Sequence, residues 1–109
     1  MVLQVVALVF MCLVTAASPA LAQAPIKVGL LAPLVGPFAQ IGKDMVAGTE
    51  MYLDEIQYTA GGRKIQLIVE DSAGNPQTAL TRARKFLEQD GVHLLTGGLL
   101  SSTAYALQP

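Results

Sequence analysis

The sequence predicts an α/β fold, in which a parallel sheet carries helices on both faces. Short β-prone runs alternate three times with segments of helical periodicity. The links between them are short and rich in glycine, proline and other turn residues. An alternating order of this kind is typical of parallel strands that are joined by right-handed helical crossovers.

Residues 1–22 differ from the rest of the chain and are interpreted as a cleaved signal peptide. The segment is almost entirely apolar from Val2 to Ala17, and it closes with Ala20-Leu21-Ala22, a small-residue pattern that signal peptidase recognises. A retained membrane anchor is the alternative, but the apolar run is shorter than the roughly 20 residues that span a bilayer. We therefore expect export to the periplasm, with residues 23–109 as the folded part.

The charges are balanced and lie entirely after the signal segment. Seven basic and eight acidic residues are interspersed without a block of one sign, for a net charge of −1. This pattern predicts no surface for nucleic acid or anionic membrane, and it favours a neutral or zwitterionic small ligand. The single cysteine, Cys12, belongs to the signal segment, so the folded part must depend on core packing instead of disulfides.

The first strand, loop and helix are predicted from the amino-terminal half of the folded part. Ile26 to Ala32 is a short apolar run, as expected of a strand covered on both faces. Residues 33–42 contain two prolines and two glycines and are expected to form a loop. A helix is predicted from Lys43 to Gln57, with Tyr52 and Leu53 on its apolar side. A turn around Gly61-Gly62 ends this unit.

The second strand and helix carry clearer boundary signals. Lys64 to Glu70 is rich in β-branched and other apolar residues and predicts a strand. Asn75 and Pro76 match a helix cap followed by proline at the first helical position. Apolar residues then recur at helical spacing from Gln77 to Asp90, and Gly91 stands where a capping glycine is common.

The loops that follow the strands are the candidate binding segments, because ligands of open parallel sheets bind outside the carboxyl ends of the strands. The third loop follows a strand predicted from Val92 to Thr96 and combines Gly97-Gly98 with hydroxyl residues at the start of a helix, Ser101-Ser102-Thr103. Free N–H groups there could bind a carboxylate. The alternative is that a serine only caps the helix. The three loops span residues 33–42, 71–75 and 97–103.

No constellation for catalysis, cofactor or metal is visible. Gly36 to Lys43 approaches a phosphate-binding loop, but five residues separate its glycines, and Asp44 replaces the hydroxyl residue. The side chains of Glu70 and Asp71 diverge on an extended chain, so they cannot form an acid and base pair. His93, the only histidine, is expected to be structural. We therefore expect neither enzyme activity nor a cofactor.

Three segments together resemble the substrate-binding proteins of branched-chain amino acid ABC transporters, which have the type I periplasmic-binding fold. The segments read IKVGLLAPLVGPFAQIGKD, GRKIQLIVEDSAGNP and TGGLLSST. The resemblance implies two α/β lobes that close on a ligand about a hinge. Residues 23–109 match only part of the amino-terminal lobe, so the second lobe is expected to be absent and the chain to be a fragment.

The resemblance also implies a binding site and a partner. The ligand carboxylate would be held by hydroxyl and N–H groups at Leu99, Ser101 and the helix start at Thr103, and Ile41 would lie over the ligand side chain. The protein would deliver a branched-chain amino acid to an ABC transporter permease in the inner membrane. An aromatic carboxylate is the alternative ligand, and a sensing domain of a signalling or regulatory protein is the alternative role. The full candidate set is Ile41, Leu99, Leu100, Ser101, Ser102 and Thr103.

Overall fold

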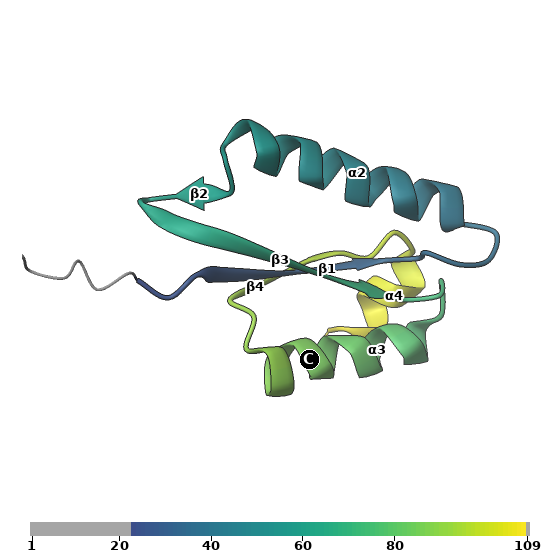
Figure 1. The fold of residues 1–109 in the computed structure, drawn as a ribbon. Helices are drawn as coiled ribbons and strands as arrows, with labels where there is room; N and C mark the ends of the chain where they lie inside the picture. The colour runs from purple at the N-terminus through teal and green to yellow at the C-terminus, as the bar shows by residue number, and fades with distance from the viewer. Residues whose placement is uncertain (1–22, 109) are drawn as a thin grey trace, which may run out of the picture.

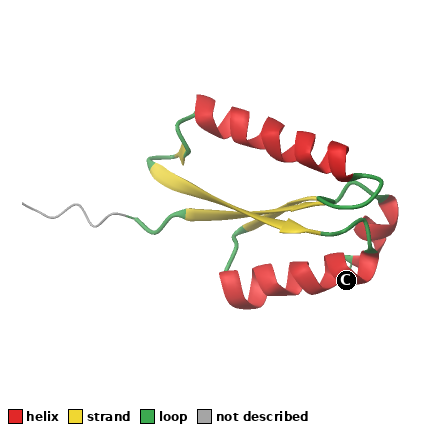
Figure 2. Cartoon of the chain, turned by 45° about the vertical axis from the view of Figure 1, so that its right-hand side comes forward, coloured by secondary structure: helices red, strands yellow, loops and turns green. Residues whose placement is uncertain are grey.

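The computed structural model describes residues 23–108; the predicted signal peptide lies outside the described residues. A central sheet is covered by one long helix on one face and by two shorter helices on the other (Figure 1). Figure 2 shows the same layers from a second direction. The helices are α2 (Ala39–Glu55), α3 (Pro76–Lys85) and α4 (Ser101–Ala106). The prediction of an α/β sheet with helices on both faces is therefore confirmed.

The sheet has four strands in the order β2-β3-β1-β4. Strand β1 pairs in parallel with β3 and with β4, as predicted. Strand β2 instead pairs antiparallel with β3, which corrects the expectation of a purely parallel sheet. Gly61 and Gly62 both have positive φ, 55° and 75°, and two such residues make the tight turn that joins hairpin strands. The strands are β1 (Ile26–Ala32), β2 (Thr59–Ala60), β3 (Arg63–Asp71) and β4 (Leu94–Gly97).

Helix α2 begins four residues earlier than predicted, because Gly42 does not act as a loop residue. A β-carbon on Gly42 would lie 1.7 Å from the carbonyl oxygen of Pro33. Glycine therefore lets the first turn of α2 pack directly on the chain that leaves β1. The side that was predicted to be apolar is only partly covered, since Leu53 is 7% exposed but Tyr52 is 60% exposed.

The core lies mainly between β1 and α3. Leu31 of β1, Ala79 of α3 and Phe86 just after it form one fully buried cluster. The Phe86 ring packs on the backbone of Gly29, where a β-carbon would lie 3.0 Å from the ring. Burial of this aromatic side chain is the largest single apolar contribution in the described core.

Helix α3 confirms the boundary residues predicted for the second helix, but the predicted helix is not α-helical throughout. The Asn75 side chain accepts hydrogen bonds from the N–H groups of Gln77 and Thr78, and Gly91 ends the segment with φ of 64°. The α-helix itself stops at Lys85, and Phe86–Asp90 form a π-helical turn.

None of the helices described between residues 23 and 108 is long and apolar enough to span a membrane.

Candidate functional site

The three predicted loops meet at one edge of the sheet, around Gly74. Because β1, β3 and β4 are parallel, their carboxyl ends lie at the same edge, on the right in Figure 1. A β-carbon on Gly74 would lie 3.4 Å from the ring of Phe38 and 3.8 Å from Cδ1 of Leu100. One residue from each loop therefore shares this contact. We call residues 33–38, 71–75 and 97–102 together the binding rim.

Asp71 connects the first two loops of the binding rim. It is the last residue of β3 and lies opposite Ala32, the last residue of β1. Its Oδ1 accepts a hydrogen bond from the Leu34 N–H and another from the Ala73 N–H, each at 2.7 Å. The N–H of Ser72 also donates to the carbonyl of Ala32 at 2.9 Å. The first loop and the second turn are thus fixed to each other as well as to the sheet.

The third loop is fixed to β1 through Gly97 and Gly98. Gly97 has φ of 98°, and a β-carbon there would lie 2.2 Å from the carbonyl oxygen of Leu31. The N–H of Gly98 donates to the same carbonyl at 2.9 Å. The glycines therefore bring the chain close to β1, and this approach places the following residues at the same edge.

The start of α4 contradicts the alternative that a serine only caps the helix. Leu100 occupies the cap position in an extended conformation, and no side chain makes a capping hydrogen bond. Ser101 and Ser102 are the first two helical residues and are exposed, and N–H groups at these positions have no acceptor within their own helix. Exposed hydroxyl and N–H donors consequently occur together at this helix start.

The other candidate residues take different places around the binding rim. Ile41 lies in the first turn of α2 and is 48% exposed, and Leu99 is 37% exposed. Leu100 is half-buried where it approaches Gly74. Thr103 is only 1% exposed, and its N–H donates to the Leu100 carbonyl at 3.0 Å. Thr103 therefore packs beneath the loop, whereas Leu99, Ser101 and Ser102 lie at its surface.

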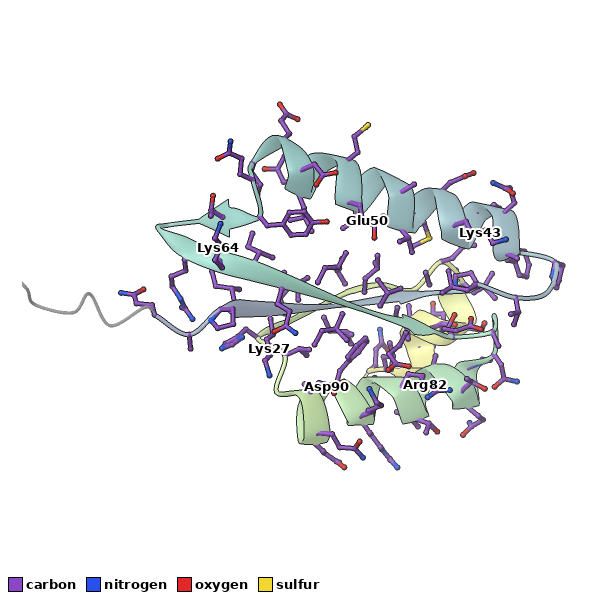
Figure 3. The ribbon with its side chains drawn as sticks, in the orientation of Figure 1. Lys27, Lys43, Glu50, Lys64, Arg82 and Asp90 are labelled. Carbon is purple, nitrogen blue, oxygen red and sulfur yellow. The ribbon has the colours of Figure 1, made fainter. Side chains whose placement is uncertain are left out.

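Glu70 points away from Asp71, toward α3, as predicted for neighbours on a strand. Lys85 Nζ lies 2.6 Å from Glu70 and 2.9 Å from Asp90, and Arg82 lies 3.5 Å from Glu70. Figure 3 shows Arg82 and Asp90 on the α3 side of the sheet. The hydrogen bond from Lys85 to Glu70, followed by the one to Asp90, raises the pKa of Lys85 above its ordinary value. This network supports the fold and offers no acid and base pair.

His93 is structural, as predicted. Its Nδ1 accepts a hydrogen bond from the Lys27 N–H at 3.0 Å, and its own N–H donates to the Lys27 carbonyl at 2.8 Å. Lys27 is the second residue of β1 and His93 directly precedes β4, so both lie at the end of the sheet opposite the binding rim. Between residues 23 and 108, no group of three His, Cys, Asp or Glu side chains is placed to hold a metal ion.

Comparison with known proteins gives one family and a consistent set of relatives. A family model described as periplasmic binding protein matches residues 25–109. The Leu/Ile/Val-binding protein BraC3 of Rhizobium johnstonii is 37% identical over 86 residues, which are 77% of this chain and 23% of that protein. The chain thus spans less than a quarter of the length of this relative.

Solved structures show the same partial overlap. An ABC transporter substrate-binding protein from Sphaerobacter thermophilus superposes with a TM-score of 0.73 at 42% identity, over 76% of this chain and 22% of that one. A solute-binding protein of an ABC transporter from R. palustris, in complex with benzoate, gives a TM-score of 0.71 at 30% identity, over 76% of this chain and 23% of that one. Both structures share the fold of about three quarters of this chain.

Proposed function

The chain belongs to the periplasmic binding protein family, and on this premise we propose that it forms part of the ligand cleft of a solute receptor that serves an ABC transporter. The family match confirms the resemblance inferred from the sequence. A family of binding proteins also agrees with the expectation that the chain is not an enzyme. Since the chain spans under a quarter of its relatives, the transport role and the ligand are both part of the proposal.

The observation that carries the proposal is the meeting of three loops at Gly74 beside the exposed start of α4. Phe38 of the first loop and Leu100 of the third loop both approach Gly74 of the second loop. Ser101 and Ser102 then offer hydroxyl groups and N–H groups without helical acceptors at one exposed place. A carboxylate is the chemical group that such donors bind best. In this arrangement Leu99 contributes its backbone and Thr103 supports the loop from below.

We propose a branched-chain amino acid as the ligand. Ile41 and Leu99 are partly exposed apolar side chains, and in the proposal they face an aliphatic ligand side chain. The Rhizobium relative is named for binding leucine, isoleucine and valine. An aromatic carboxylate is the second candidate, supported by the R. palustris structure with benzoate. Both ligands carry a carboxylate, but only the amino acid has an amino group, and the remaining group is aliphatic in one and aromatic in the other.

The proposed receptor works outside the cytoplasm. Cleavage of the signal segment after Ala22 would release the folded part into the periplasm. The partner would then be the ABC transporter permease in the inner membrane, which accepts the ligand after the receptor has bound it. The balanced charge of the chain agrees with a small neutral or zwitterionic cargo.

Site-resolved NMR tests this function on the protein that a bacterial host secretes from the 109-residue sequence. We expect leucine to shift the amide signals of Leu99, Ser101 and Ser102, because its carboxylate binds there. Leucinamide, which lacks the carboxylate, is the matched control and should leave these signals in place. Shifts with benzoate but not leucine would select the aromatic alternative. The proposal fails if neither carboxylate moves any of the three signals.

A further inference from the structure

We infer that Asp71 is a positioning residue for ligand binding, which sets the separation of the first two loops of the binding rim; this inference rests on the proposed function. Its Oδ1 joins the N–H of Leu34, just after β1, to the N–H of Ala73, just after β3. The two donors belong to loops that are separated by a helix and a hairpin. A single carboxylate oxygen therefore fixes both loops to one point.

The contact to Ala73 alone would be an ordinary local feature. Aspartate often accepts a hydrogen bond from the N–H two residues later and so stabilises a turn. Ala73 also has φ of 51°, a conformation that costs energy for any residue with a side chain, and this bond offsets part of the cost. The contact to Leu34 has no such local explanation, because 37 positions separate the two residues.

The bond to Leu34 acts on the part of the site that would cover the ligand side chain. Leu34 begins the loop that leads through Phe38 to Ile41, in the first turn of α2. The far end of the loop is held where Gly42 contacts the Pro33 carbonyl, and Phe38 is held against Gly74. Asp71 supplies the connection from this loop to the turn that contains Gly74. Loss of the carboxylate should free Leu34 and the neighbouring Pro33, on whose carbonyl the first turn of α2 packs through Gly42. The shift should therefore displace Ile41 and leave the serines of the third loop in place.

The first test measures the bonds directly in the unmodified secreted protein. Scalar coupling across a hydrogen bond is detectable by NMR, and we expect cross-peaks from the Asp71 carboxyl carbon to the amides of both Leu34 and Ala73. The β1–β3 backbone bonds serve as the internal reference. A cross-peak to Ala73 without one to Leu34 would reduce Asp71 to a local turn residue and overturn the inference.

The second test uses Asp71→Ala with Asp44→Ala as the matched control. Asp44 also carries one negative charge, but its carboxylate accepts from Gln40 on its own helix at 2.9 Å. In Asp71→Ala we expect the Leu34 amide to exchange with solvent about tenfold faster or more, the effect of losing a bond to a charged acceptor. Exchange at Leu30 should change much less. Asp44→Ala should leave Leu34 unchanged, and equal acceleration in both variants would contradict the inference.

A leucine titration of the same variants separates this inference from the proposed function. With Asp71→Ala we expect the ligand-induced shift at Ile41 to fall by half or more, while the shifts at Ser101 and Ser102 persist. Unchanged shifts at Ile41 would show that Asp71 does not position the site. If leucine and benzoate shift nothing in the unmodified protein, the proposed function fails, and the coupling and exchange measurements still decide whether Asp71 fixes the two loops.

Discussion

Gly42 of α2 lies directly against the carbonyl oxygen of Pro33, and a β-carbon at that position would come within 1.7 Å of the oxygen. The oxygen belongs to the backbone and cannot rotate away. We predict that Gly42→Ala destabilises the fold by about 3 kcal/mol or more, because the helix must move off the chain that leaves β1. Urea unfolding of the secreted protein measures the change.

Gly48 provides the matched control on the same helix. A β-carbon there meets no atom within 4 Å. Gly48→Ala should therefore stabilise the protein by up to about 1 kcal/mol through its higher helix propensity. Opposite signs for the two substitutions are expected, and loss of stability in both would show that α2 packs differently at one of these positions.

Phe86 and Gly29 are expected to be energetically coupled. A β-carbon on Gly29 would lie 3.0 Å from the Phe86 ring, which is fully buried. Gly29→Ala should cost about 1–3 kcal/mol by overpacking. In the double-mutant cycle with Phe86→Leu, the smaller side chain should recover part of that cost, so the two free-energy changes should not add. Simple additivity would contradict the contact.

Lys85 makes the stability depend on pH in the alkaline range. Its pKa is raised in the folded state by the hydrogen bond to Glu70 and then by the one to Asp90, above the ordinary value of 10.5. Because folding raises this pKa, the stabilisation by protonated Lys85 is complete at a pH below the unfolded-state pKa. It is lost as the pH rises through the folded-state pKa. The stability difference between the wild type and Lys85→Met should therefore shrink above about pH 10.5.

The control for Lys85 is Lys64→Met. Lys64 is exposed and takes part in no ion pair among the described residues. The difference in the free energy of unfolding between Lys64→Met and the wild type should stay nearly constant between pH 8 and pH 11. Tyr58, whose pKa is raised by burial and by Asp54 and Glu50, is present in both variants and cancels from the comparison. A pH-independent Lys85→Met difference would contradict the ion network.

The predicted signal peptide has one expected cleavage site, after Ala22. Mass spectrometry of the secreted protein should find Gln23 as the first residue, because signal peptidase requires small residues such as Ala20 and Ala22. Ala22→Phe should block cleavage. Leu21→Phe, between the two small positions, should be tolerated and is the control. An intact amino terminus in the unmodified protein would instead favour the membrane anchor.

The sequence predicted best the features that depend on neighbouring residues. Asn75 and Gly91 act through the turn next to them, so their roles could be read from the local pattern. In the sequence Gly42 looks like a loop residue, because it follows a segment rich in glycine and proline. Only its contact with Pro33 in the structure shows why it belongs to the helix. Leu100 takes the cap position because Gly97 and Gly98 hold the third loop against β1, which no local pattern reveals.

The binding rim could likewise be predicted from the sequence only in part. Alternating strands and helices were sufficient to place the three loops at one edge, because parallel strands require it. The bond between Asp71 and Leu34 depends on which residues of two separate loops come within reach, and on which side of the strand end the carboxylate lies. The adjacent acids Glu70 and Asp71 were correctly predicted to diverge, but no pattern in the sequence indicated that one of them joins two loops.

The binding rim alone should hold leucine only weakly. Its donors at Ser101 and Ser102 can bind a carboxylate, but association costs several kcal/mol in lost freedom, and a few exposed hydrogen bonds do little more than offset that cost. We predict a dissociation constant no tighter than about 1 mM for the protein secreted from this sequence. Ser101→Ala should reduce the leucine-induced NMR shifts at Leu99 and Ser102, whereas Ser72→Ala, in the second turn, should reduce them much less. Calorimetry that finds micromolar leucine binding would show that the described loops already form a complete site.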